Sequence, residues 1–154
     1  MSLNGLLTAL AKDPAFERIR VSAERGPDVA DEKEIAAPDG LRPPLVAQIA
    51  QALPQPAGGG GGARAVTVVV TPTGRAAGDL VDALGSYLPE GAVEEFPAWE
   101  TLPHERLSPK SDTVGRRLNV LRRLHVRDEA LKVVVMPVRS LIQPIVDGLS
   151  LIHI

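Results

Sequence analysis

The residues of this chain best suited to hold phosphate groups are arginines concentrated in one predicted helix. They are Arg116, Arg117, Arg122, Arg123 and Arg127. Guanidinium groups pair with phosphate oxygens through parallel N–H donors, so such a cluster is typical of a nucleic-acid contact. The ring of Trp99, which is able to stack on a base, would add to such a site. A nucleic-acid interface built from Trp99 and the first four of these arginines is therefore one candidate function.

The same arginines have a second interpretation, which we favour, as the solvated face of an amphipathic helix. The predicted helix also carries an apolar stripe, formed by Val114, Leu118 and Leu121. At about 100° per residue, Arg116 and Arg123 lie opposite that stripe. We therefore expect the apolar stripe to face the interior and the arginines to face water.

Residues 37–44 lie where a P-loop protein would bind phosphate, between a predicted strand and a predicted helix. Such a loop needs glycine-rich backbone, a Lys for the β- and γ-phosphates, and a Ser or Thr for magnesium. The stretch reads Ala37-Pro38-Asp39-Gly40-Leu41-Arg42-Pro43-Pro44. Pro43 and Pro44 stand where Lys and Ser or Thr are required, and proline has no N–H to donate. We predict a degenerate P-loop that binds no nucleotide.

Other catalytic patterns are incomplete. His104-Glu105 begins like a zinc-protease helix, but Ser108 stands in the place of the second histidine. The chain has three histidines, no cysteine and no GxSxG elbow. We therefore predict no catalytic residue and no metal site.

Composition limits the remaining classes. The chain has 154 residues, of which 44% are hydrophobic and 3% aromatic, with a formal net charge of -2. This balance argues against the overall basic excess of a nucleic-acid coat protein. The lack of cysteine fits a reducing cytosol, no apolar run is long enough for a membrane span, and the N-terminus lacks the basic region and apolar core of a signal peptide. We expect a cytoplasmic protein without membrane contact.

Apolar runs and helical spacing alternate along the chain. The expected strands are 34–37, 65–70, 91–96 and 132–136. The expected helices are 2–11, one opening at Asp13-Pro14, 41–53, 75–88, one capped by Asp112 or Thr113, and 138–146. The run 65–70 is apolar on both faces, as a strand buried in a parallel sheet requires. The pattern predicts an α/β fold, with a mostly parallel sheet, helices on both faces and short helices in front.

The segment 96–109 is too irregular for a helix and too rich in proline for an interior strand. Its core reads Trp99-Glu100-Thr101-Leu102-Pro103-His104-Glu105-Arg106-Leu107-Ser108-Pro109, with Asp112-Thr113-Val114-Gly115-Arg116-Arg117-Leu118 soon after. These residues resemble the N-terminal region of bacterial transcription-repair coupling factor. The resemblance also covers 68–84, 121–124 and 138–144. Within it, we expect Trp99 and Phe96 to pack the loop down and brace the lobe.

The resemblance implies a UvrB-like lobe with a partial RecA-like, P-loop NTPase-type fold. In this family the N-terminal copy has lost its Walker A residues, which agrees with the prolines of 37–44. The turn Thr71-Pro72-Thr73-Gly74 falls at the helicase motif that contacts nucleic acid in the active relatives. We expect 1–148 to be this lobe, with a flexible glycine connector at 54–63, and 149–154 to be a truncated or non-family tail.

The resemblance also implies a function for the parent protein. The family protein is an ATP-driven DNA translocase that displaces RNA polymerase stalled at a lesion and recruits UvrA for nucleotide excision repair. Its motor domains, which use ATP and magnesium, and its UvrA-binding domain lie outside this fragment. We therefore expect a non-catalytic scaffold and regulatory lobe without a cofactor. Its expected partners are the missing domains and, in the parent, RNA polymerase, UvrA and double-stranded DNA.

Overall fold

The computed structural model describes residues 3–24, 34–53, 65–99 and 110–143. The elements in chain order are α1 (Asn4–Leu10), α2 (Pro14–Glu24), the 3-10 helix η1 (Asp39–Leu41), α3 (Arg42–Ala52), β1 (Thr67–Thr71), α4 (Gly74–Leu84), β2 (Val93–Glu95), α5 (Ser111–His125), β3 (Val133–Pro137) and α6 (Val138–Ile142). The expected connector at 54–63, His104 and the expected tail at 149–154 lie outside the described residues.

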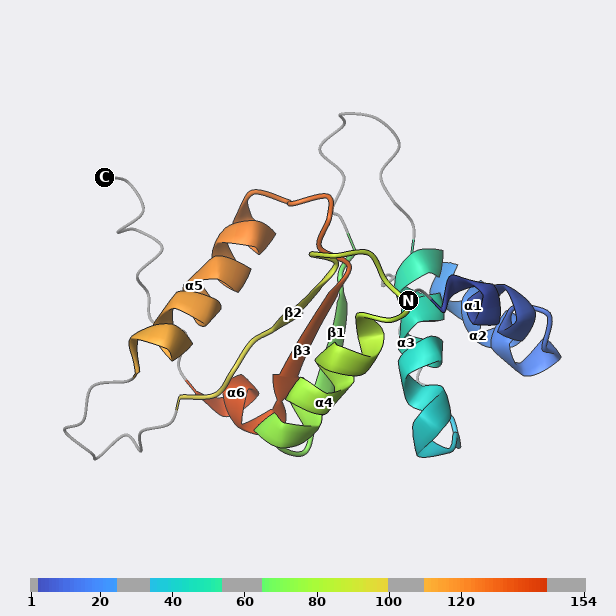
Figure 1. Ribbon diagram of the computed structural model, residues 1–154, viewed down its shortest axis with the longest axis horizontal. Helices are drawn as coiled ribbons and strands as arrows, with labels where there is room; N and C mark the ends of the chain where they lie inside the picture. Colours follow the sequence, from blue (N-terminus) through green and yellow to red (C-terminus); the bar gives the residue numbers. More distant parts are fainter. Residues whose placement is uncertain (1–2, 25–33, 54–64, 100–109, 144–154) are drawn as a thin grey trace.

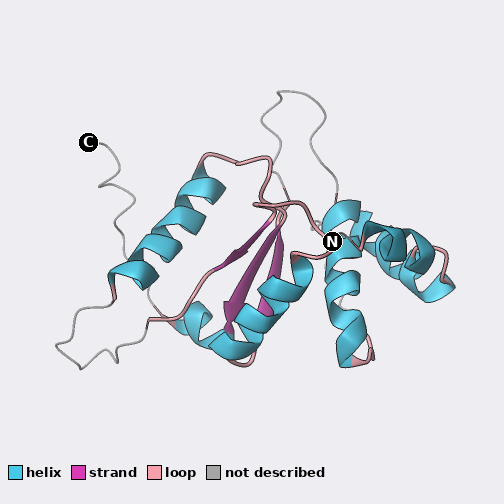
Figure 2. Ribbon diagram, in the orientation of Figure 1, coloured by secondary structure: helices cyan, strands magenta, loops and turns pink. Residues whose placement is uncertain are grey.

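The three described strands form one parallel sheet in the order β1-β3-β2. Val133 of the central strand pairs with Thr67 of β1 and with Val93 of β2. Each connection between strands carries a helix, α4 after β1 and α5 after β2, as parallel pairing requires. Figure 2 shows the strands side by side between the helices. The α/β fold predicted from the sequence is confirmed.

The sheet separates two hydrophobic cores, because alternate residues of a strand point to opposite faces. Val133 and Val135 belong to the first core and Val134 to the second. The first core includes residues of α3 and α4, namely Ala47, Ala50, Ala77 and Leu84. The second includes Phe96, Val120 of α5 and Leu131. Helices therefore cover both faces of the sheet, as Figure 1 shows for α4 and α5.

The strand β1 differs from expectation, because only one of its faces is covered. Val69 packs against the first core, but Val68 is 55% exposed and Val70 is 46% exposed. The prediction that this strand is buried on both faces was wrong. β1 lies at one edge of the described sheet, and α5 contacts β2 at the other edge.

The predicted strand at 34–37 is absent, because residues 34–38 carry no regular secondary structure. Ile35 is 42% exposed, and none of these residues pairs with a described strand. Ile35 is the only β-branched residue of this stretch, and Pro38 ends it with a residue that cannot donate to a ladder. The chain therefore reaches η1 and α3 from a loop.

Two short helices precede the sheet, as predicted. Asp13 Oδ1 accepts a hydrogen bond from the N–H of Ala15 (2.7 Å) and so caps the start of α2. Gln48 of α3 donates from Nε2 to the carbonyl oxygen of Leu7 (2.8 Å), which attaches α1 to α3. Figure 1 shows α1 and α2 lying beside α3, away from the sheet. Among the described helices, none has the length and apolar character needed to cross a membrane.

Candidate functional site

The chain that leaves β2, from Phe96 to Trp99, runs between α5 and α6 at the carboxyl end of the sheet, where α/β proteins place their sites. We call it the Phe96–Trp99 segment. The Phe96 N–H donates to the carbonyl oxygen of Val135 (2.8 Å), which prolongs the pairing of β2 with β3. Ser140 of α6 donates from Oγ to the carbonyl oxygen of Phe96 (3.1 Å). The start of the segment is therefore fixed to both β3 and α6.

Gln143, which follows α6, holds the other end of this segment. The Trp99 N–H donates to Gln143 Oε1 (2.6 Å), and Gln143 Nε2 donates to the carbonyl oxygen of Trp99 (3.1 Å). The amide side chain thus pairs with both backbone groups of one residue, as a neighbouring strand would. Ser140 and Gln143 were not among the sequence-predicted site residues. Their three-residue spacing directly after a buried strand is the signal that would have singled them out.

Arg117 of α5 holds the same segment from the other side. Its Cζ lies 4.1 Å from the centroid of the Phe96 ring and 4.3 Å from that of the Trp99 ring. Its Nη1 donates to the carbonyl oxygen of Pro97 (2.7 Å). The residue is 2% exposed, and its burial lowers the pKa of the guanidinium. Phe96 and Trp99 were predicted to pack the loop down. In the structure both rings pack against Arg117, a contact that the sequence did not indicate.

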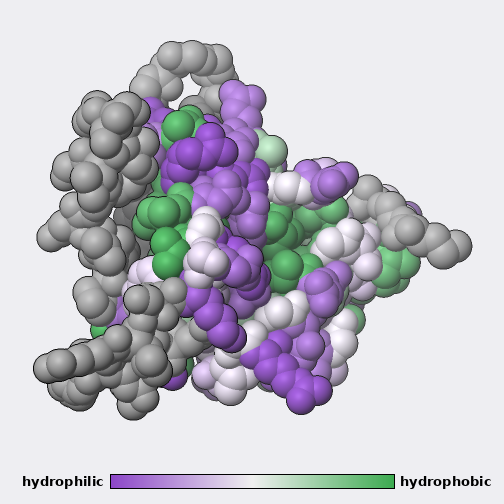
Figure 3. All heavy atoms as spheres, turned by 60° about the vertical axis from the view of Figure 1, so that its left-hand side comes forward, coloured by the Kyte–Doolittle hydropathy of each residue, from purple (hydrophilic) through white to green (hydrophobic). Residues whose placement is uncertain are grey.

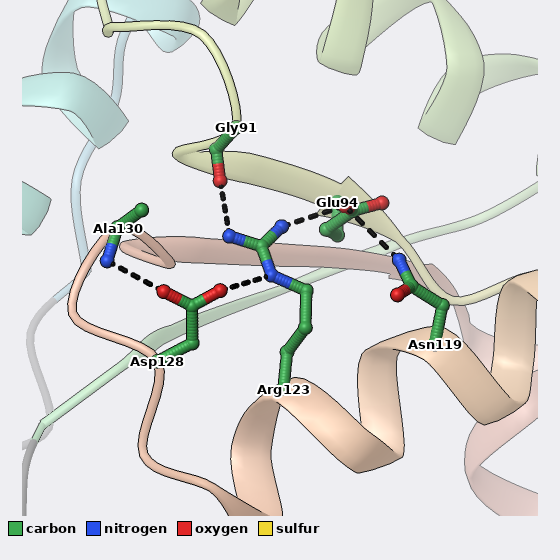
Figure 4. Close-up of polar contacts among 6 residues, drawn as sticks. All are labelled: Gly91, Glu94, Asn119, Arg123, Asp128 and Ala130. Atoms are coloured by element: carbon green, nitrogen blue, oxygen red, sulfur yellow. Dashed lines mark hydrogen bonds and ion pairs between the residues drawn. The ribbon is translucent and has the colours of Figure 1, made fainter.

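Arg123 connects the end of α5 to β2 and to the loop that follows the helix (Figure 4). Its Nη1 donates to Glu94 Oε1 (2.6 Å), its Nε to Asp128 Oδ2 (2.6 Å) and its Nη2 to the carbonyl oxygen of Gly91 (2.7 Å). Asn119 Nδ2 also donates to Glu94 Oε1 (3.4 Å). Every nitrogen of this buried guanidinium therefore has an acceptor.

The other two candidate arginines of α5 are more accessible. Arg116 Nη2 lies 2.6 Å from Glu95 Oε2, and the Arg116 side chain is 46% exposed. Arg122 is exposed to solvent. Of the four arginines proposed to meet nucleic acid, two are thus buried in contacts within the chain and a third is paired with a carboxylate. Whether any of them contacts DNA stays a prediction.

The orientation of α5 corrects the sequence interpretation. Its buried residues are Thr113, Arg117, Val120 and Arg123, whereas Leu118 is 48% exposed. The expectation that the stripe with Leu118 faces inward and Arg123 faces water was wrong. Arg117 and Arg123 face inward because they donate hydrogen bonds to acceptors on β2 and its flanks. These acceptors belong to Gly91, Glu94 and Pro97. Figure 3, turned so that the α5 side comes forward, shows a hydrophilic band with hydrophobic residues beside it.

The start of α5 also differs slightly from expectation. The helix begins at Ser111, so Asp112 and Thr113 lie in its first turn and neither is the N-cap. Lys110 occupies the N-cap position without a side-chain cap hydrogen bond. Asp112 still places a negative charge near the positive end of the helix dipole, which is favourable.

The predicted degenerate P-loop forms η1 and the start of α3. Pro43 and Pro44 lie in the first turn of α3, where a phosphate-binding helix would present N–H groups. Arg42 pairs with Asp39 (2.8 Å) on the surface. An open cavity of about 460 Å³ lies here, lined by Ile35, Ala36, Ala37, Pro38, Arg42 and Leu45. Among the described residues, its lining contains no lysine, serine or threonine.

The turn after β1 uses its hydroxyl groups internally. Thr71 Oγ1 donates to the carbonyl oxygen of Thr73 (3.0 Å), and Thr73 Oγ1 accepts from the N–H of Ala76 (3.1 Å). Thr73 is thus the N-cap of α4. No cluster of His, Asp and Glu suited to a metal ion occurs among the described residues.

The fold and the site define an α/β protein with a parallel sheet and a clamped segment at its carboxyl edge. No protein-family model matches the chain. Curated relatives do: the chain is 39% identical over 154 residues to the transcription-repair-coupling factors of Mycobacterium bovis and Mycobacterium tuberculosis, an alignment that covers 97% of this chain and 11% of each relative. The transcription-repair-coupling factor of Haemophilus influenzae is 37% identical over 78 residues, 51% of this chain and 6% of the relative.

The chain is therefore homologous, over nearly its whole length, to part of the transcription-repair-coupling factors. This confirms the resemblance seen in the sequence. The chain spans about 11% of the length of the mycobacterial relatives.

Proposed function

We propose that this chain is a non-catalytic, UvrB-like lobe of a transcription-repair-coupling factor, with a scaffold and regulatory role. The homology to factors of that name supports the family part of this proposal. The start of α3 supports the proposal that the lobe is non-catalytic. Pro43 and Pro44 stand there in place of the N–H donors and side-chain ligands that a nucleotide needs. The lobe would hold a partial RecA-like fold over 1–148, with 149–154 as a non-family tail.

The activity of the parent protein is part of the same proposal. The parent would be an ATP-dependent DNA translocase that displaces stalled RNA polymerase and recruits UvrA to the lesion in the cytoplasm. ATP and magnesium would bind in motor domains outside this chain. A scaffold role is supported by the Phe96–Trp99 segment, which Arg117 of α5 and Ser140 of α6 hold in place through hydrogen bonds to its backbone.

Isothermal titration calorimetry with magnesium-ATP tests directly the proposal that this lobe binds no nucleotide. We expect no binding heat from this chain at concentrations up to the millimolar range. The full-length coupling factor, which contains the proposed motor domains, serves as the positive control. Micromolar binding to this chain that Arg42→Ala weakens would contradict the proposal, because Arg42 is the only cation among the described residues that line the cavity beside α3.

A nucleic-acid interface remains the alternative, supported by the exposure of Arg116 and Arg122. Fluorescence anisotropy with a labelled duplex at low salt separates the two functions. If the alternative holds, affinity falls steeply with salt and falls further in the double variant Arg116→Ala, Arg122→Ala. Arg18→Ala, an exposed arginine of α2, is the matched control. No anisotropy change at low salt would end the alternative.

A further inference from the structure

A cavity lies between α1 and α3, on the side of the sheet opposite to α5. Its volume is about 410 Å³, and it is lined by Leu7, Thr8, Ala11, Gln48 and Gln51. This volume falls within the range of roughly 300–1,000 Å³ that is typical of ligand pockets. Figure 1 shows the two helices beside each other, next to α2. The proposed function leaves this cavity without a role.

Gln48 brings an amide oxygen without a donor to this cavity. The residue is 8% exposed, and its Nε2 donates to the carbonyl oxygen of Leu7 (2.8 Å). No hydrogen bond to Gln48 Oε1 is found among the described residues. A buried acceptor that lacks a donor lowers the stability of a fold, so this oxygen requires a partner. The cavity that Gln48 lines is the space from which such a partner reaches it.

Gln51 places a second amide at the same cavity. It follows Gln48 by three residues in α3, so the two side chains are neighbours on one face of the helix. Gln51 is exposed, and no hydrogen bond of its side chain is found among the described residues. An amide side chain offers both donors and an acceptor, which match the C=O and N–H groups of a peptide backbone. Gln143 bonds both backbone groups of Trp99 in this way within the same chain.

The rest of the lining discriminates between classes of ligand. None of the described lining residues carries a charge, so a phosphate or a carboxylate would find no cation here. None of them is aromatic, so a nucleobase would find no ring on which to stack. The side chains of Leu7 and Ala11 offer an apolar surface to a small side chain. An uncharged peptide therefore fits this lining best.

We propose that this cavity binds the backbone of an extended, uncharged protein segment, one of whose N–H groups donates to Gln48 Oε1. The amide of Gln51 pairs with a neighbouring peptide unit of the segment. A small side chain of the segment contacts Leu7 and Ala11. The inference does not depend on the absence of ATP binding, so its failure and the failure of the proposed function are distinguishable.

Nuclear magnetic resonance titration of the isotope-labelled chain tests this site. The probe is the neutral peptide N-acetyl-trialanine methylamide, and the side-chain amide signals of Gln48 and Gln51 are followed. We expect saturable shifts of both signals, with a dissociation constant in the millimolar range. N-acetyl-trisarcosine dimethylamide, in which methyl groups replace every N–H donor, should cause no such shifts. Adenosine, a neutral nucleoside, is titrated in parallel.

Two variants separate binding in the cavity from contact elsewhere. Ala11→Leu fills the cavity and should weaken binding of the alanine peptide at least tenfold. The matched change Ala15→Leu, at an exposed position of α2, should leave binding unchanged. Gln51→Met removes the second amide at an exposed position and should weaken binding several-fold. It decides the question if circular dichroism shows that Ala11→Leu does not fold.

Three results would overturn the proposal. The first is the absence of shifts with the alanine peptide, or equal shifts with the sarcosine peptide. The second is an affinity that stays unchanged in the folded Ala11→Leu chain or in Gln51→Met. The third is a response to adenosine without one to the alanine peptide, which would indicate a nucleoside site instead.

Discussion

Arg123 Nη1 lies 2.6 Å from Glu94 Oε1, and this bond joins the last turn of α5 to β2, across 29 positions of sequence. Burial opposes the charged form of Arg123, but its hydrogen bonds to Asp128 and Glu94 outweigh this effect and raise its pKa. A raised pKa means that the bonds stabilise the fold at every pH below the ordinary arginine value. The guanidinium is therefore a charged link throughout the physiological range.

Arg123→Met should destabilise the chain by about 2 kcal/mol, because two carboxylates and the Gly91 carbonyl lose their donor. The value lies below the roughly 3–5 kcal/mol typical of a broken buried pair, since the side chains of Glu94 and Asp128 are 30% and 31% exposed. Urea unfolding followed by circular dichroism measures it. The matched variant Arg122→Met should change stability by less than about 0.5 kcal/mol. Equal losses of unfolding free energy at the two positions would show that the bonds of Arg123 between α5 and β2 do not stabilise the fold.

Gly91→Ala should cost about 1 kcal/mol or more, because Gly91 has φ +76°, which L side chains rarely adopt. An added Cβ would lie 3.9 Å from Arg123 Nη2, an ordinary contact, so the cost arises in the backbone. Gly78→Ala is a control for which we expect a stability change of the opposite sign. It lies inside α4 with no atom near the added Cβ and should stabilise by up to about 1 kcal/mol. Thermal unfolding that shows the same sign for both changes would contradict this reasoning.

Thr73→Ala should destabilise the chain by about 1 kcal/mol, because the start of α4 loses its side-chain cap. Thr73→Ser keeps an acceptor at the same position and should retain most of the stability. Chemical unfolding of the three chains compares the free energies. If the serine variant loses as much as the alanine variant, the methyl group and not the cap is responsible.

The hydrogen bond from Arg20 lowers the pKa of Glu17, more than burial raises it, at the surface of α2. Because the folded pKa lies below the unfolded one, the contribution of Glu17 is present above the unfolded value of about 4.3 and is lost as pH falls through the folded value. The difference in unfolding free energy between the native chain and Glu17→Gln should therefore shrink toward zero in acid. A difference that stays constant from pH 7 to pH 3 would contradict the assignment.

The secondary structure of the sheet was readable from the sequence, because it follows local rules. The valine runs that end in Val70 and Val135 fall in strands of the parallel sheet. Asp13 before Pro14 predicted the start of α2, and its side chain bonds the Ala15 N–H. The segment 34–37 failed because a short apolar stretch becomes a strand only if a partner strand lies beside it.

The sequence alone determined the α/β order of elements, the presence of Pro43 and Pro44 where a P-loop would carry Lys and Ser or Thr, and the resemblance to the coupling factors. Periodicity and residue chemistry are properties of neighbouring residues, so they need no fold. Only the tertiary structure decided which face of α5 is buried and that Arg117 lies against Phe96 and Trp99. The reason is physical: the acceptors that turn the arginine face inward come from β2 and its flanks, more than 15 positions away along the chain. Helical periodicity records where side chains point on one helix, and it contains no information about those acceptors.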